Sequence, residues 1–148
     1  MKEKIILHRG YKGKYLENSK ISFEMALKEN KNFETDIRIS KDGVCYMIHD
    51  NILDNLFNGS GKINDFLSEE LKEFHYKEDS LQKLCSLKEM CELVNENPGK
   101  SLIFIHIKEL KDIKKIISVL EQYNFKDRLR FFAVDEIVLF WSFGFYFV

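Results

Sequence analysis

The spacing of apolar and polar positions divides the chain into short strands and amphipathic helices. Runs of apolar residues predict strands at 4–8, 102–107 and 130–134, and the run at 102–107 is continuous enough to be buried on both faces. Apolar residues at helical spacing predict helices over 20–30, 65–74 and 113–120, and another that begins after Ser86 and ends before Asn97. Ser19 and Ser86 precede the first and third helices and are favourable N-caps, while Asn97-Pro98-Gly99 ends the third.

Residues 33–49 predict a β-hairpin, because Asp42-Gly43 lies between two β-prone runs and this dipeptide favours a two-residue type I′ turn. Such a turn places Asp36 opposite His49. Opposed residues share a face and side chains alternate along a strand, so Glu34 joins them at the open end. For this stretch alone, a solvated hairpin end is an equally good interpretation.

The predicted order, β-α-β-β-α-α-β-α-β, is typical of the α/β class with a largely parallel sheet. Active sites in such folds gather where the strands end. His8, His49 and His106 each lie at or near the end of a predicted strand. The histidines are therefore candidates for a common site.

Length, charge and cysteine content narrow the class of protein. The chain has 148 residues, enough for one domain, and a net charge of −1, which gives no reason to expect nucleic acid as a partner. The apolar run near the N-terminus is too short for a secretion signal. The chain has three cysteines, an odd count that predicts reduced thiols, so we expect a cytoplasmic protein.

Residues 137–148 are uncharged and rich in aromatic side chains, unlike residues 1–136. The run is shorter than the roughly 20 residues that a transmembrane helix needs, so no transmembrane segment is predicted. A buried terminal strand, an interface and a tail read out of frame all fit its composition. We expect residues 1–136 to form the domain and residues 137–148 to be a separate apolar tail.

The polar residues at the predicted strand ends combine three kinds of chemistry. Two carboxylates, Glu34 and Asp36, suit a hard cation. Histidines can exchange protons near neutral pH, and an arginine or a lysine can neutralise a phosphate. The members of this group are His8, Arg9, Glu34, Asp36, His49, His106 and Lys108. Each residue alone has an ordinary structural explanation, but together they fit phosphodiester cleavage.

These residues stand within a series of short motifs, in order His8-Arg9-Gly10, Glu17-Asn18-Ser19, Glu34-Thr35-Asp36, Lys41-Asp42-Gly43 and His49-Asp50. Their order and spacing resemble the glycerophosphodiester phosphodiesterase family, more weakly as far as Lys108. The resemblance implies a distorted (β/α)8 barrel that hydrolyses glycerophosphodiesters to an alcohol and glycerol 3-phosphate with a divalent cation.

The resemblance also implies roles for individual residues. His8 and His49 would be the general acid and base, and Arg9 and Lys108 would hold the phosphate. Glu34 and Asp36 would be metal ligands, together with the residue at position 106. Glu17 and Asn18 would brace the loop after the first strand.

The chain departs from the family pattern in two important ways. His106 stands where the family has a third metal carboxylate, and imidazole suits Mn²⁺, Zn²⁺ or Fe²⁺ better than Mg²⁺ or Ca²⁺. The cation is therefore left open among Mg²⁺, Ca²⁺ and Mn²⁺. The chain is also shorter than the roughly 250 residues of a full barrel, which predicts a partial TIM-barrel-like fold with an incomplete second half.

Two alternatives to an active enzyme remain open at this point. The chain could be a catalytically impaired or truncated relative that only binds a phosphate ligand or a partner chain. A homo-oligomer could cover the open edge of the barrel, because exposed strand edges favour association.

Overall fold

The computed structural model describes residues 5–109, 111 and 113–133. The strands are β1 (Ile6–Leu7), β2 (Asn32–Ile39), β3 (Cys45–Met47), β4 (Ile103–Ile107) and β5 (Leu129–Ala133). The helices are α1 (Lys20–Lys28), α2 (Ser68–Leu71), α3 (Leu87–Glu96) and α4 (Ile113–Leu120), with 3₁₀ turns at Ile63–Asp65 and Lys126–Arg128. The predicted order of elements is therefore confirmed within the described residues.

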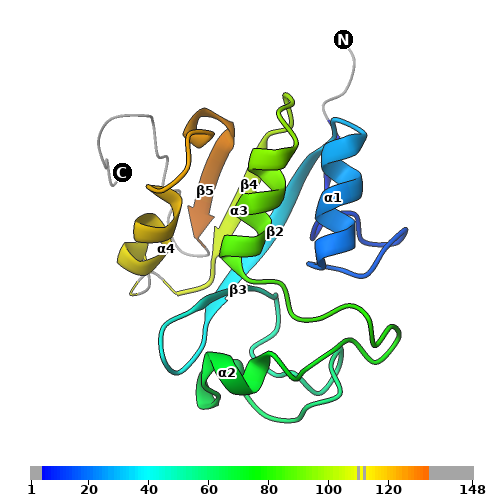
Figure 1. Ribbon diagram of the computed structural model, residues 1–148, viewed down its shortest axis with the longest axis vertical. Helices are drawn as coiled ribbons and strands as arrows, with labels where there is room; N and C mark the ends of the chain where they lie inside the picture. Colours follow the sequence, from blue (N-terminus) through cyan, green and yellow to red (C-terminus); the bar gives the residue numbers. More distant parts are fainter. Residues whose placement is uncertain (1–4, 110, 112, 134–148) are drawn as a thin grey trace.

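The strands form one sheet in the order β1-β2-β4-β5, with all neighbours in this row parallel. β3 pairs antiparallel with the second half of β2, on the edge where β1 pairs with the first half. α1, α3 and α4 lie side by side on one face of the sheet (Figure 1). This half-covered parallel sheet matches the predicted α/β class with a partial barrel.

The main core lies between the sheet and these three helices. Alternate sheet residues, such as Ile37 and Ile105, are buried there against helix residues such as Phe23 and Met90. Because side chains alternate along a strand, the polar residues next to these isoleucines in β2 and β4 point to the opposite face. None of the described helices covers that face, which carries the candidate site.

A second apolar cluster fills the segment 50–84, which contains α2 and lies beyond the C-terminal ends of the strands (Figure 1). Tyr76 is one of its fully buried members and packs against Phe57, with ring centroids 4.4 Å apart and an interplanar angle of 47°. The Tyr76 hydroxyl donates a 2.7 Å hydrogen bond to the main-chain carbonyl of Glu17. The segment is therefore attached to the loop that follows β1.

The predicted register of the hairpin is wrong by one residue. Ile37 pairs with Met47 and Ile39 with Cys45, so Asp36 does not face His49, and the Ile48 amide donates to the Asp36 carbonyl instead. The cause is a three-residue loop in place of the two-residue turn.

The loop spans residues 41–43, with a β-turn closed by a hydrogen bond from the Gly43 amide to the Ser40 carbonyl. Gly43 alone takes the left-handed conformation, at φ +91°, so the turn is not type I′. The Asp42 carboxylate accepts hydrogen bonds from the Ser40 hydroxyl and from the amide and hydroxyl of Ser68. These contacts hold Asp42 in a conformation that a type I′ turn excludes.

The helix predicted over 65–74 is also wrong in length, because only Ser68–Leu71 is α-helical. Leu71 is buried in the second cluster, while Phe66 packs edge-on against Phe74 at 5.1 Å. A bent segment brings these side chains together, which one straight helix would not.

Three other expectations concern the cysteines, the C-terminal tail and a membrane span. Cys45, Cys85 and Cys91 are buried and form no disulfide within the described residues, in agreement with the expected reduced thiols. Val134, the last residue of the predicted fifth strand, and the tail at 137–148 lie outside the described residues. None of the described helices combines the length and the apolar character that crossing a membrane requires.

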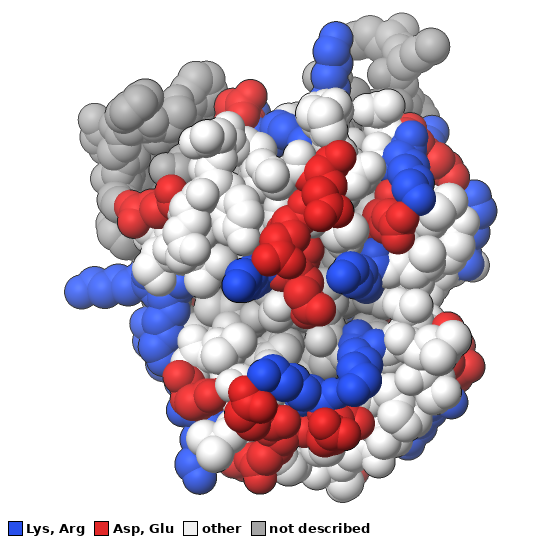
Figure 2. Space-filling view, viewed as in Figure 1, with Lys and Arg blue, Asp and Glu red and all other residues white. Residues whose placement is uncertain are grey.

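On the helix-covered side, acidic and basic side chains are interspersed (Figure 2). The surface is hollowed between α3 and the region of α2, at a pocket whose lining includes Lys72, Lys83 and Lys88 as well as Glu73 and Glu89. This face therefore carries charges of both signs, in keeping with the near-zero net charge of the chain.

Candidate active site

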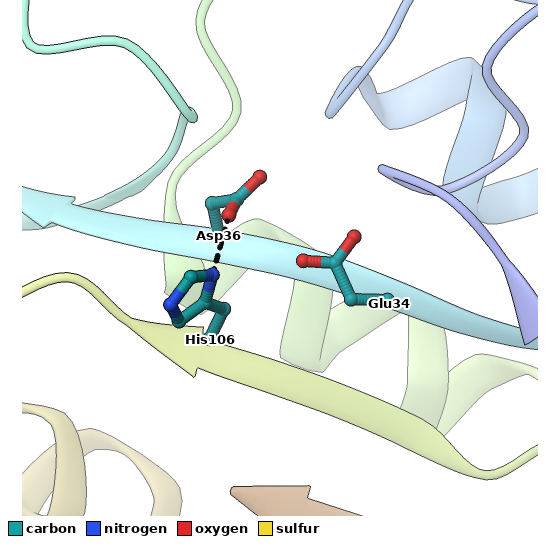
Figure 3. A group of neighbouring side chains, drawn as sticks. All are labelled: Glu34, Asp36 and His106. Atoms are coloured by element: carbon teal, nitrogen blue, oxygen red, sulfur yellow. Dashed lines mark hydrogen bonds and ion pairs between the residues drawn. The ribbon is translucent and has the colours of Figure 1, made fainter. Parts of the chain in front are cut away.

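Asp36 is the centre of the polar group on the uncovered face of the sheet. Its side chain is 1% exposed, and the residue is the register partner of His106 on the neighbouring strand β4. His106 Nδ1 lies 3.2 Å from Asp36 Oδ1 (Figure 3). The Lys108 ammonium lies 2.8 Å from the same oxygen and 2.9 Å from His106 Nδ1.

Glu34 stands two residues before Asp36 on β2, and therefore on the same face (Figure 3). Its Oε2 accepts a 3.0 Å hydrogen bond from the Arg9 amide and lies 3.9 Å from His8 Nε2. Glu34, Asp36 and His106 each offer a ligand atom, and these atoms lie within 4.8 Å of one another. The three residues are spaced closely enough to hold one metal ion.

The two carboxyls differ strongly in proton affinity. Burial raises the pKa of Glu34 to about 7, and the negative charge of Asp36 adds to the rise. Burial would also raise the pKa of Asp36, but hydrogen bonds from Lys108 and Asn18 outweigh it and lower this pKa. A metal cation bound beside Glu34, in addition to the Lys108 ammonium, would reduce the repulsion between the two carboxylates.

Arg9 links this group to the loop after β1. It has a left-handed backbone, at φ +50°, and its Nε lies 3.8 Å from Asp36 Oδ2. Its Nη1 donates a 2.7 Å hydrogen bond to Glu17, which also pairs with Lys12 at 2.5 Å. Burial opposes ionisation of Glu17, but these two partners keep its pKa below the usual value. Glu17 thus holds the Arg9 guanidinium at the edge of the site.

Asn18 forms a buried hydrogen bond with the Asp36 carboxylate. It is 2% exposed and adopts φ +52°. Its Nδ2 donates to Asp36 Oδ2 at 3.2 Å, and its Oδ1 accepts a 2.8 Å hydrogen bond from the Thr35 hydroxyl. Asn18 therefore fixes the orientation of the central carboxylate.

The two histidines proposed for proton transfer have different surroundings. The His8 side chain is 64% exposed. Its partial burial, and then the positive charge of Arg9, still lower its pKa. His49 Nδ1 lies 2.7 Å from Asp50 Oδ1, and its main-chain carbonyl accepts a 2.7 Å hydrogen bond from Arg38 Nε. Contacts link the other six predicted residues to one another, whereas the contacts described for His49 are with Asp50 and Arg38.

Comparison with known proteins decides the family. The model of the Glycerophosphoryl diester phosphodiesterase family matches residues 8–143. The chain belongs to this family. A glycerophosphodiester phosphodiesterase of Bacillus altitudinis is 34% identical over 146 residues, which cover 95% of this chain and 58% of that protein. One from Caldanaerobacter subterraneus subsp. tengcongensis is 29% identical, covering 87% and 57%.

Solved structures confirm the fold of this family member. A phosphodiesterase from Oleispira antarctica, solved in complex with its product sn-glycerol-3-phosphate, superposes with a TM-score of 0.79 at 25% identity. A glycerophosphodiester phosphodiesterase from Thermotoga maritima gives 0.73 at 34% identity. The chain spans 57% and 54% of these two structures, and 88% and 89% of its own length is covered. The parallel sheet described above is thus part of a TIM-barrel-type fold.

The sequence analysis did not name Arg38, whose side chain contacts the candidate residue His49. Arg38 lies on β2 two residues after Asp36, so the period-two spacing that joined Glu34 to Asp36 also predicts its direction. Its contact with the His49 carbonyl was not predictable, because it depends on the corrected hairpin register.

Proposed function

We propose that this chain hydrolyses glycerophosphodiesters to an alcohol and glycerol 3-phosphate, with a divalent cation and a pair of histidines. The observation that carries the proposal is the convergence of two carboxylates, two cationic side chains and an exposed histidine around Asp36. It is supported by family membership and by the relatives that carry this activity in their names.

Glu34, Asp36 and His106 are the residues that would hold the cation. The fit is supported by the spacing of their ligand atoms and by the raised pKa of Glu34, which reflects burial and uncompensated repulsion. A bound cation would supply charge stabilisation at a phosphoryl oxygen. Among the described residues, His106 Nε2 is buried without a hydrogen-bond partner, so the imidazole is not committed to another acceptor.

Proton transfer falls to His8 and His49. His8 is the more exposed, and its lowered pKa favours the neutral form, which suits a proton acceptor. The Asp50 carboxylate faces His49 Nδ1, which holds a proton on this nitrogen and leaves Nε2 for exchange with substrate. With a second proton on Nε2, His49 can protonate the leaving alcohol, while neutral His8 accepts the proton of the attacking water.

Arg9 and Lys108 bring positive charge to the position where a phosphate would bind. Both already contact Asp36, and each is mostly buried, with 15% and 9% of the side chain exposed. Charge-assisted hydrogen bonds in such partly buried sites are stronger than those in water. These two side chains are suited to neutralise the phosphodiester as it reacts.

The experiment is a coupled assay for glycerol 3-phosphate released from glycerophosphocholine, with Mn²⁺, Mg²⁺ or Ca²⁺. We expect metal-dependent release that falls at least about 100-fold in His8→Ala and in His49→Ala, the scale of a lost acid or base. His75→Ala, at a histidine of the segment 50–84, is the matched control and should retain activity. Wild-type protein that releases no product with any of these cations would refute the proposal.

A second candidate function is phosphate binding without turnover. It is favoured by the contact of Lys108 with Asp36, which already neutralises the central carboxylate, and by His106 in place of a carboxylate. Calorimetry with glycerophosphocholine separates the two, since binding without product supports this candidate and product formation excludes it. A homo-oligomer that covers the open sheet remains a prediction, which light scattering tests.

A further inference from the structure

We propose that Glu34, Asp36 and His106 form a site that selects Mn²⁺ or Co²⁺ over Mg²⁺ and Ca²⁺. The inference rests on the proposed function in the sense that it names the cation of the same site. It depends on His106, because the other two ligands are carboxylates that bind hard cations well.

The donor set itself favours a transition metal. Mg²⁺ and Ca²⁺ prefer oxygen ligands, whereas first-row transition metals bind sites that contain nitrogen with an affinity that rises from Mn²⁺ to Co²⁺. Here one of three donors within 4.8 Å is a histidine nitrogen. A neutral imidazole also contributes no negative charge, and the affinity for Ca²⁺ depends on the number of charged ligands. Both effects weaken the binding of Mg²⁺ and Ca²⁺.

The hydrogen bonds of His106 place its lone pair on the side of the carboxylates. A lysine ammonium can only donate hydrogen bonds, so the 2.9 Å contact from Lys108 assigns the acceptor role to His106 Nδ1. The same nitrogen lies 3.2 Å from Asp36 Oδ1. The unprotonated nitrogen that a metal requires therefore already points toward Asp36.

The imidazole ring is held in this orientation by its neighbour on β5. His106 is the register partner of Phe132, and their rings stack at 4.6 Å with an interplanar angle of 17°. On its other side the ring meets Asp36 of β2. A ring packed between two strands loses little freedom when it binds a metal, which favours affinity.

Lys108 competes with a cation for Asp36. Its ammonium lies 2.8 Å from Asp36 Oδ1, and the repulsion between two positive charges rises as they approach. A cation that forms a strong bond to the His106 nitrogen can displace the Lys108 ammonium from Nδ1 more readily than a cation that interacts with oxygen alone. The competition therefore increases the preference for Mn²⁺ and Co²⁺.

Equilibrium dialysis and calorimetry of the full chain at pH 7.5, with each of the four cations in turn, test the inference. We expect the dissociation constants for Mn²⁺ and Co²⁺ to be at least about tenfold lower than those for Mg²⁺ and Ca²⁺. His106→Glu should reduce this preference at least about tenfold, and His106→Gln should weaken Co²⁺ binding by a similar factor. The visible absorption spectrum of bound Co²⁺ should show nitrogen and oxygen ligation without thiolate bands.

His75→Gln removes an imidazole elsewhere in the chain and should leave all four affinities unchanged. The inference is overturned if no cation binds, if wild type binds Mg²⁺ or Ca²⁺ as tightly as Mn²⁺, or if His106→Gln keeps full Co²⁺ affinity. Should His106→Glu fail to fold by circular dichroism, wild type and His106→Gln still decide. Selective binding without turnover would refute the proposed function alone, whereas turnover without selective binding would refute this inference alone.

Discussion

Asn18 offers a sharp test of how the site is supported, because its side chain and its backbone make separable contributions. Asn18→Ala removes the hydrogen bond to the Asp36 carboxylate and leaves the buried Thr35 hydroxyl without its partner. A hydrogen bond to a charged group contributes about 1.5–3 kcal/mol. The left-handed backbone at φ +52° costs alanine about 1 kcal/mol.

Together these effects should lower the free energy of unfolding of Asn18→Ala by about 2.5–4 kcal/mol. Asn18→Gly loses the same hydrogen bonds but tolerates the left-handed conformation, so it should be about 1 kcal/mol more stable than the alanine variant. Urea unfolding followed by circular dichroism measures both differences. Wild-type stability in Asn18→Ala, or no gain from alanine to glycine, would refute the reasoning.

Three further predictions follow from the same contacts. In metal-free buffer above about pH 7, Glu34→Gln should be more stable than wild type. The pKa of Glu34 is raised, first by burial, so wild type loses stability as the pH rises from about 4.5 through 7. Urea titrations should show that the difference in unfolding free energy between the two proteins vanishes below about pH 4.5. Tyr76→Phe should cost about 1–2 kcal/mol in the same assay, because the Glu17 carbonyl loses a buried donor; an unchanged midpoint would contradict this. Arg38→Gln should lower kcat more than it raises KM for glycerophosphocholine, since Arg38 positions His49, and Arg38→Lys should restore part of the loss; a change in KM alone would argue against that role.

The grouping of Glu34, Asp36, His106 and Lys108 could be predicted from the sequence, because it depends only on alternation within single strands and on strands ending at one edge. The position of His49 could not. It depends on the length of the turn, and the contacts of Asp42 with Ser40 and Ser68 stabilise a loop that is one residue longer than the predicted turn.

The hydrogen bonds that hold the site residues in place could not be predicted from the sequence pattern either. The motif resemblance pointed to Glu17 and Asn18 as braces, yet it could not show that Asn18 holds Asp36 directly. The contact between Tyr76 and Glu17 joins residues 59 positions apart, and local periodicity carries no information on such pairs. Long-range side-chain hydrogen bonds therefore required the structure.

We propose that the residues around Asp36 form a working phosphodiesterase site in this chain. The most direct measurement is a ³¹P NMR time course of glycerophosphocholine with the purified protein and Mn²⁺, beside Asp36→Asn as the matched variant. The substrate resonance should be replaced by that of glycerol 3-phosphate with wild type and persist with the variant. An unchanged substrate resonance with wild type, or equal conversion by Asp36→Asn, would contradict the account.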